Sequence, residues 1–264
     1  MLPEFFTSAM AFNPVMEKVA QQDRELDIPR RFSEVASRYG CILAGSYLRV
    51  ANENVYNTML LQFPDGSQLF HDKDIPTQFE NCYFTCGDRN RAKGAIGVAL
   101  CWEMLRTQTI AEMPAGLKVV AAGSCWWDIS DDKSNPELRR YNHRLSESTP
   151  ARFARLLGVP VIHAAHVGKV VGFRNSFDRS IVRRQLIGST RIIDHRGNKR
   201  RQLEIADGDA ILMDEVELPP RQIPQESAKG FWTVEFRQEY LDAWKRENRL
   251  GQAFYSANRQ RMVG

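Results

Sequence analysis

Runs of apolar, often β-branched residues recur along the chain and alternate with segments of helical periodicity. Short apolar runs bounded by Gly, Pro or Asn are typical of strands, whereas apolar residues spaced three or four positions apart are typical of helices that cover a sheet. This pattern predicts strands at 41–50, 55–63, 94–101, 117–122, 159–166, 185–194 and 210–218. It predicts helices at 31–39, 103–112 and 136–157, each followed closely by Gly or Pro.

The short segments between neighbouring strand candidates indicate how the strands connect. Residues 64–66 (PDG) and 195–198 (HRGN) have the composition of tight hairpin turns. A mixture of strands, hairpins and helices predicts an α/β fold in which sheets are covered by helices. No repeat, low-complexity tract or Gly/Ser linker divides the chain, so we expect one domain over residues 1–218.

The tail, residues 219–264, loses strand character. Aromatic residues at Phe236, Tyr240 and Trp244 recur at four-residue spacing. This spacing places them on one face of a helix, so we expect an amphipathic helix within 231–248 that packs on the body of the protein or on a partner.

Composition places the chain among ordinary folded proteins. It has 264 residues, 43% hydrophobic and 26% charged, and a net charge of +4. These values exclude a disordered or collagen-like chain. The longest uncharged apolar run, 156–168, is shorter than a membrane span, and the first residues lack the basic start of a signal peptide. The five cysteines are an odd number, which favours reduced thiols over disulfides, and we expect a cytoplasmic protein.

Two other functions are weighed and set aside. Segment 179–201 holds eight basic residues against one acid, as a nucleic-acid-binding surface would, but stacking aromatics are not interleaved and a solvated hairpin explains the charges. Cys82 and Cys86 lie near His71 in the sequence, yet a second pair of zinc ligands is missing. We therefore expect no nucleic-acid partner, no bound metal and no cofactor.

The most informative stretch is GAIGVALCWEMLRTQTIAEM, residues 94–113. An apolar strand runs into Cys101 and helix-forming residues follow at once, so the thiol is predicted to stand at a sharp strand-to-helix turn, as the serine does in a nucleophile elbow. The N–H of Trp102 would then be placed to donate to an oxyanion. The alternative is an inert core cysteine, because buried cysteines are common.

Eight blocks of the sequence, in this order, resemble the nitrilase superfamily of carbon-nitrogen hydrolases. They are LPEFF, AGSYLRV, VYNTMLLQFPDG, HDKDIPTQFE, GVALCWE, VVAAGSCWW, LGVPVIHAAHVG and IGSTRIIDHRGN. The resemblance covers nearly everything from Met1 to about Leu218. It implies a four-layer α-β-β-α sandwich that assembles as a homodimer or a higher homo-oligomer, with a Glu-Lys-Cys catalytic triad.

Carried onto this sequence, the resemblance assigns three catalytic residues and several supporting ones. Glu4 matches the general base, Lys73 the triad lysine and Cys101 the nucleophile, while Glu80 falls where the family has a second carboxylate near the lysine. Trp102 would supply the oxyanion donor. Trp126 and Trp127 lie where the family places residues that line the substrate pocket, although strand alternation favours burial in the core for one of them.

One departure from the family concerns the start of the chain. Family members have a strand and a helix before the catalytic glutamate, and here Glu4 is almost the first residue. The resemblance thus implies a fold without its usual first strand and helix, and we expect this form to be unstable or weakly active because neighbouring strands would lose hydrogen-bond partners.

The predicted function is cleavage of non-peptide carbon-nitrogen bonds in small amides or nitriles through a covalent thioester. The tripeptide CWE slightly favours nitriles, but the same triad also serves amides and carbamoyl compounds. The alternative is a catalytically weak scaffold or binding protein that retains the fold.

Overall fold

The computed structural model describes residues 1–129, 136–174, 179–221 and 230–264, which divide into two compact units. Unit 1 comprises Met1–Glu4, Arg91–Val170 and Arg183–Val234, and unit 2 comprises Phe5–Asn90, Val171–Val182 and Glu235–Gly264.

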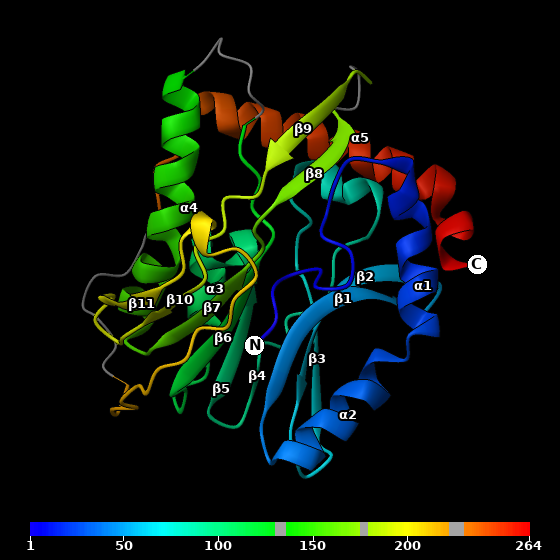
Figure 1. Cartoon of the computed structure of the whole chain (residues 1–264). Coiled ribbons are helices and arrows are strands. Elements are labelled where there is room, and N and C mark those ends of the chain that lie inside the picture. The colour runs from blue at the N-terminus through cyan, green and yellow to red at the C-terminus, as the bar shows by residue number, and fades with distance from the viewer. Residues whose placement is uncertain (130–135, 175–178, 222–229) are drawn as a thin grey trace. The chain divides into compact units, whose positions relative to one another are not determined.

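Unit 2 is built on a three-stranded antiparallel sheet in the order β1-β2-β3. Its strands are β1 (Leu43–Ala51), β2 (Asn54–Gln62) and β3 (Gln68–Asp72). Helices α1 (Val19–Glu25) and α2 (Ile28–Tyr39) lie beside this sheet and contact it through their apolar faces (Figure 1). The 3-10 helices η1 (Pro14–Lys18) and η2 (Gln78–Cys82) and the last helix, α5 (Gln238–Val263), complete the unit.

Unit 1 contains a six-stranded sheet in the order β11-β10-β7-β6-β5-β4, in which β5, β6 and β7 are parallel. The strands are β4 (Ala92–Lys93), β5 (Ile96–Leu100), β6 (Val119–Ser124), β7 (Val161–Ala165), β10 (Arg191–Ile193) and β11 (Lys199–Gln202). The 3-10 helix η3 (Cys101–Leu105) and helix α3 (Thr107–Ala111) follow β5. Helix α4 (Pro136–Leu157) precedes β7, and the 3-10 helix η4 (Ile205–Asp207) follows β11.

The apolar core of unit 1 lies between the parallel strands and helix α4. Ala99 of β5, Val120 of β6 and Val161 of β7 project to the same side, where they meet Phe153 and Leu157 of α4. Because side chains alternate along a strand, Gly123 lies on the opposite side of the sheet from Ala122 and Val120. That opposite side receives the first residues of the chain.

A further pair of strands, β8 (Lys169–Phe173) and β9 (Ile181–Gln185), forms a two-stranded sheet whose residues are divided between the units. Most of the sequence-derived elements agree with the structure. The strands predicted at 41–50, 55–63, 94–101, 117–122 and 159–166 correspond to β1, β2, β5, β6 and β7, and the helices predicted at 31–39 and 136–157 correspond to α2 and α4. Both predicted hairpin turns are present, between β2 and β3 and between β10 and β11.

Two strand predictions need correction. Residues 210–218 form no strand, and Ile211 and Met213 are 89% and 78% exposed. An apolar run becomes a strand only where a neighbouring strand offers hydrogen bonds, which a local pattern cannot reveal. Residues 185–194 contain only the end of β9 and the short β10, because Gly188 and Ser189 have left-handed backbone conformations, with φ of 72° and 71°, which interrupt an extended chain.

Two helix predictions also need correction. The helix predicted at 103–112 is instead the 3-10 helix η3 followed by the short α3. The tail helix expected within 231–248 begins at Gln238 and continues beyond 248 to Val263. The backbone before it bonds to another segment and does not continue the helix, since the Thr107 N–H donates to the Phe231 carbonyl (3.1 Å) and the Thr233 N–H to the Leu105 carbonyl (2.7 Å). In the described part of the chain, no helix has the length and apolar character that a bilayer crossing requires.

Candidate active site

Cys101 stands at the carboxyl end of strand β5, where the chain turns sharply into η3. Its backbone has a φ of 50°, a left-handed conformation that non-glycine residues rarely adopt. Its side chain is almost fully buried, with 3% of the residue exposed. Such a strained turn after a strand is the local geometry that presents a nucleophile in a hydrolase elbow. This backbone geometry agrees with the turn expected from the sequence.

A buried ion pair holds this turn in place. The Glu103 carboxylate accepts from the backbone N–H of Leu100 (2.8 Å) and pairs with the Arg91 guanidinium (2.9 Å). Neither side chain of the Glu103–Arg91 pair is exposed. Arg91 also pairs with Glu112 (2.8 Å). Because a buried charge that loses its partner is costly, these contacts fix η3 directly against the end of β5.

Glu4 lies at the carboxyl end of the neighbouring strand β6. It is fully buried, and its Oε2 accepts from the backbone N–H of Cys125 (2.9 Å), the residue that follows β6. The Nε2–H of His166, the residue that follows β7, donates to the Glu4 carbonyl (2.7 Å). Both the carboxylate and the backbone of Glu4 are therefore anchored at the ends of parallel strands.

Gly123 allows this close approach. A Cβ atom at position 123 would lie 2.8 Å from the Glu4 nitrogen and 3.3 Å from the Pro3 carbonyl carbon. Leu100 of β5 is the register partner of Gly123. Cys101, which follows β5, and Cys125, which follows β6 and binds Glu4, therefore lie at the same carboxyl edge of the sheet. The carboxyl edge of parallel strands is where open α/β sheets place their ligands.

Trp102, the residue that follows Cys101, packs against two other tryptophans. The Trp102 ring lies 6.1 Å from that of Trp126 and 5.9 Å, edge to face, from that of Trp232. Trp126 is 6% exposed, and its indole N–H donates to Asn142 (2.9 Å). Trp126 thus belongs to a packed aromatic cluster within unit 1, whereas Trp127 is half-buried and its backbone pairs with Leu186.

Behind the sheet edge, His163 of β7 is a structural histidine. Its Nδ1–H donates to the Ser189 carbonyl (3.2 Å), so its Nε2 accepts from the Ser124 hydroxyl (2.9 Å). Burial, together with the nearby positive charge of Arg191, lowers the pKa of His163 to about 3. A neutral ring with both nitrogens engaged holds the end of β6 and offers no base for Cys101.

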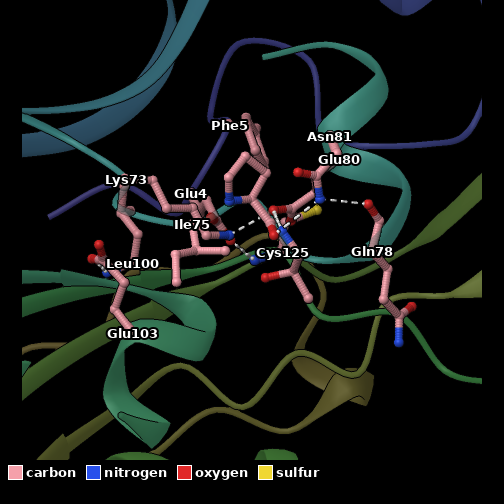
Figure 2. A network of polar contacts seen from close by, with 12 residues as sticks. Glu4, Phe5, Lys73, Ile75, Gln78, Glu80, Asn81, Leu100, Glu103 and Cys125 are labelled. Carbon is pink, nitrogen blue, oxygen red and sulfur yellow. Dashed lines mark hydrogen bonds and ion pairs between the residues drawn. The ribbon is translucent and has the colours of Figure 1, made fainter. Parts of the chain in front are cut away.

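The lysine expected in the triad belongs to unit 2. Lys73 directly follows β3, and its ammonium donates to Oε2 of Glu80 (2.7 Å). The side chains of this pair are 0% and 2% exposed. The same Glu80 oxygen accepts from the backbone N–H of Thr77 (2.7 Å), so the carboxylate is held by its own segment as well as by the lysine. Figure 2 shows the Lys73–Glu80 pair of unit 2 and, within unit 1, the contact of Glu4 with Cys125 and that of Glu103 with Leu100.

The predicted site residues are divided between the two units. Unit 1 holds Glu4 and Cys101 at adjacent strand ends, together with the three predicted tryptophans, and unit 2 holds the Lys73–Glu80 pair. Within the described residues, no group of three or more His, Cys, Asp or Glu side chains is arranged to hold a metal ion.

The sequence matches the carbon-nitrogen hydrolase family over residues 1–216. The chain belongs to the carbon-nitrogen hydrolase family. Membership in this family supports a hydrolase of the nitrilase superfamily. No curated protein matches the sequence.

Solved structures of this superfamily have a similar fold. A carbon-nitrogen hydrolase from Helicobacter pylori G27 has 22% identity and a TM-score of 0.65, covering 80% of this chain and 72% of its own. A superfamily protein from Xanthomonas campestris with an arsenic adduct in its active site has 18% identity and a TM-score of 0.55, with coverages of 81% and 85%. An amidase from Nesterenkonia sp. has 15% identity and a TM-score of 0.53, with coverages of 77% and 72%. The expected nitrilase-like α/β fold is confirmed.

Sequence reasoning missed several residues that shape the site of this family member. Cys125 and His166 both anchor Glu4. Cys125 comes shortly after the strand predicted at 117–122, and His166 is the last residue of the strand predicted at 159–166, so their place at the carboxyl ends was a usable signal. The Arg91–Glu103 pair left no such signal, because its partners lie twelve positions apart on either side of a strand.

Proposed function

We propose that this family member is a thiol hydrolase that cleaves the carbon-nitrogen bond of small amides or nitriles, with Glu4, Lys73 and Cys101 as its catalytic triad. The observation that carries the proposal is that a strained, buried cysteine follows β5 and a buried carboxylate is anchored at the end of β6, the adjacent parallel strand. A thiol needs a base to become a nucleophile, and Glu4 is the carboxylate held at that sheet edge.

The reaction with an amide proceeds in two halves. Glu4 takes the proton of the Cys101 thiol, and the sulfur forms a bond to the carbonyl carbon. Glu4 then returns the proton to the nitrogen, the carbon-nitrogen bond breaks, and ammonia or an amine leaves behind a thioester. Water attacks this thioester with Glu4 as base, which releases the acid and restores the thiol. A nitrile passes through a thioimidate, which takes up water before ammonia leaves.

Lys73 is proposed to stabilise the negative charge that develops on the substrate oxygen or nitrogen, together with the N–H of Trp102. Each such donor contributes about 3 to 4 kcal/mol in a site without water. Glu80 holds the Lys73 ammonium in a single position, since its oxygen is also fixed by Thr77. We propose that Trp127, the half-buried member of the predicted pocket pair, contacts the substrate, whereas the Trp126 indole nitrogen is occupied by Asn142.

The deciding experiment measures ammonia release from a panel of short amides, N-carbamoyl amino acids and nitriles, with Cys101→Ala as the blank. We expect release from at least one class, at least about 10²-fold above the blank, and an equal loss in Glu4→Gln. The exposed thiol variant Cys86→Ala is the matched control and should keep full activity. Failure of every panel member to give Cys101-dependent release would favour the scaffold alternative.

Iodoacetamide labelling tests the nucleophile without a substrate. Exposure alone ranks Cys86 ahead of the buried thiols, and burial raises the pKa of Cys82 to about 12, which makes that thiol unreactive. If Glu4 activates Cys101, mass spectrometry will show Cys101 modified faster than Cys86. Equal rates, or Cys86 first, contradict an activated Cys101.

A further inference from the structure

Helix α5 lies outside the segment that matches the family, yet within unit 2 it packs directly on the segment that carries Glu80. The family match ends at residue 216, and α5 begins at Gln238. Helix α5 therefore contributes contacts that lie outside the part of the chain that the family match covers.

One side chain of α5 makes the decisive contacts. Oδ1 of Asn248 accepts from the backbone N–H of Gln78 (2.9 Å) and from Nδ2 of Asn81 (3.0 Å). Asn248 is 9% exposed and Asn81 1%, so water competes little for either bond. Gln78 lies two positions before Glu80 and Asn81 one position after it. Asn248 therefore forms hydrogen bonds to the η2 segment on both sides of Glu80.

The η2 segment needs an external support. Gln78 has a φ of 55°, which is strained for a residue with a side chain. Its N–H takes Asn248 as partner, while the Asn81 amide also bonds to the carbonyls of Pro76 (3.1 Å) and Gln78 (2.8 Å). A strained turn persists only where surrounding contacts hold it, and here Asn248 supplies two of them.

The rest of the helix face fits the same contact. Gly251, one turn after Asn248, leaves room for η2, since a Cβ atom there would lie 2.6 Å from the Asn81 Cβ. Glycine weakens a helix interior, so its presence at this contact is explained by the close approach. One turn further, the Tyr255 hydroxyl accepts from the Val55 N–H at the start of β2 (2.7 Å). Helix α5 therefore bonds both to η2 and to the sheet whose last strand, β3, directly precedes Lys73.

We propose that Asn248 is a positioning residue for catalysis, which holds η2 so that Glu80 keeps the Lys73 ammonium in its reactive place. The inference rests on the proposed function, because it assigns Lys73 a role in turnover. Asn248 acts through Glu80 and does not touch the substrate. Loss of its acceptor oxygen releases the η2 turn, and a displacement of a fraction of an ångström at a charge-stabilising group lowers the rate without weakening the thiol.

The experiment compares Asn248→Leu, which removes the acceptor, with Asn248→Asp, which keeps it, and with Arg249→Ala, an exposed neighbour on the same helix. We expect Asn248→Leu to lower kcat about tenfold to a hundredfold with KM little changed. Asn248→Asp and Arg249→Ala should stay within about twofold of the wild type. The rate of Cys101 alkylation by iodoacetamide should not change in any of them, because that step does not use Lys73.

Gly251→Ala disturbs the same contact between α5 and η2 from a second position, so it can replace Asn248→Leu if that variant does not fold. A folded Gly251→Ala protein should also lose kcat and keep its alkylation rate. Wild-type kcat in a folded Asn248→Leu or Gly251→Ala protein overturns the inference, and so does loss of kcat in Asn248→Asp with an intact melting transition. Failure of the proposed function is distinguishable, since the wild type itself would then release no ammonia in a Cys101-dependent manner.

Discussion

The position of Glu4 depends on the absence of a side chain at Gly123, which makes Gly123→Ala a sharp test of the general base. The new methyl carbon would lie 2.8 Å from the Glu4 nitrogen, and ordinary van der Waals contact begins at 3.4 Å. The Glu4 backbone must therefore shift by about 0.6 Å. Because the Glu4 carboxylate also accepts from the backbone N–H of Cys125, which directly follows strand β6, the shift changes the orientation of the carboxylate.

The expected loss follows from that displacement. Misplacement of a catalytic group by about 1 Å costs roughly a hundredfold in rate, so about 0.6 Å predicts a loss of about tenfold in kcat. Overpacking of a buried site also costs about 1 to 3 kcal/mol of stability, which is small enough for the protein to remain folded at low temperature. Alkylation of Cys101 by iodoacetamide should slow by a similar factor, since both rates depend on proton removal by Glu4.

The assay measures kcat, the Cys101 alkylation rate and urea unfolding in parallel for wild type, Gly123→Ala and Gly116→Ala. Gly116 is exposed, and a Cβ atom there would have no neighbour within 4 Å, so Gly116→Ala is the matched control and should resemble the wild type. A folded Gly123→Ala protein with wild-type turnover and wild-type alkylation would refute the assignment of Glu4 as the base.

Two further predictions concern stability. Glu103→Ala removes one partner of a fully buried ion pair and should lower the free energy of unfolding, measured in urea, by about 3 to 5 kcal/mol. Glu112→Ala, which removes the partly exposed partner of Arg91, should lower it less. Similar losses in the two variants would show that burial of the pair is not decisive. The pKa of His163 is lowered to about 3, below the ordinary 6.5, so its contribution to stability is present above pH 6.5 and is lost as the pH falls toward 3. Relative to pH 7, the free energy of unfolding of the wild type at pH 5 should therefore fall by about 2 kcal/mol more than that of His163→Gln, and parallel pH profiles would contradict a buried neutral ring.

The sequence was informative where chemistry and local structure coincide. The apolar run before Cys101 and the helix formers after it predicted a sharp turn, and the backbone at Cys101 has the left-handed conformation that such a turn requires. The blocks of sequence around Glu4 and Lys73 indicated the family, which the match over residues 1–216 confirms. These features are local, because a turn, a strand and a short motif are each encoded by neighbouring residues.

Failures occurred where long-range partners decide the structure. Residues 210–218 have the composition of a strand but form none. The helix expected within 231–248 starts only at Gln238, because the backbone before it bonds to Leu105 and Thr107. Composition does not say which backbone groups will find each other across a hundred residues.

The sequence by itself determined the family, the order of most strands and helices, and the identity of the candidate nucleophile, base and lysine, since each is written in a short stretch of chain. Only the tertiary structure decided the buried contacts of the site. The Glu4 carboxylate accepts from the Cys125 N–H, next to Gly123. Arg91 forms an ion pair with Glu103 in the turn after Cys101, and Asn248 binds the segment that carries Glu80. The physical reason is that a buried polar group must find its partner wherever folding brings one, and the partner's place in the sequence is free to vary.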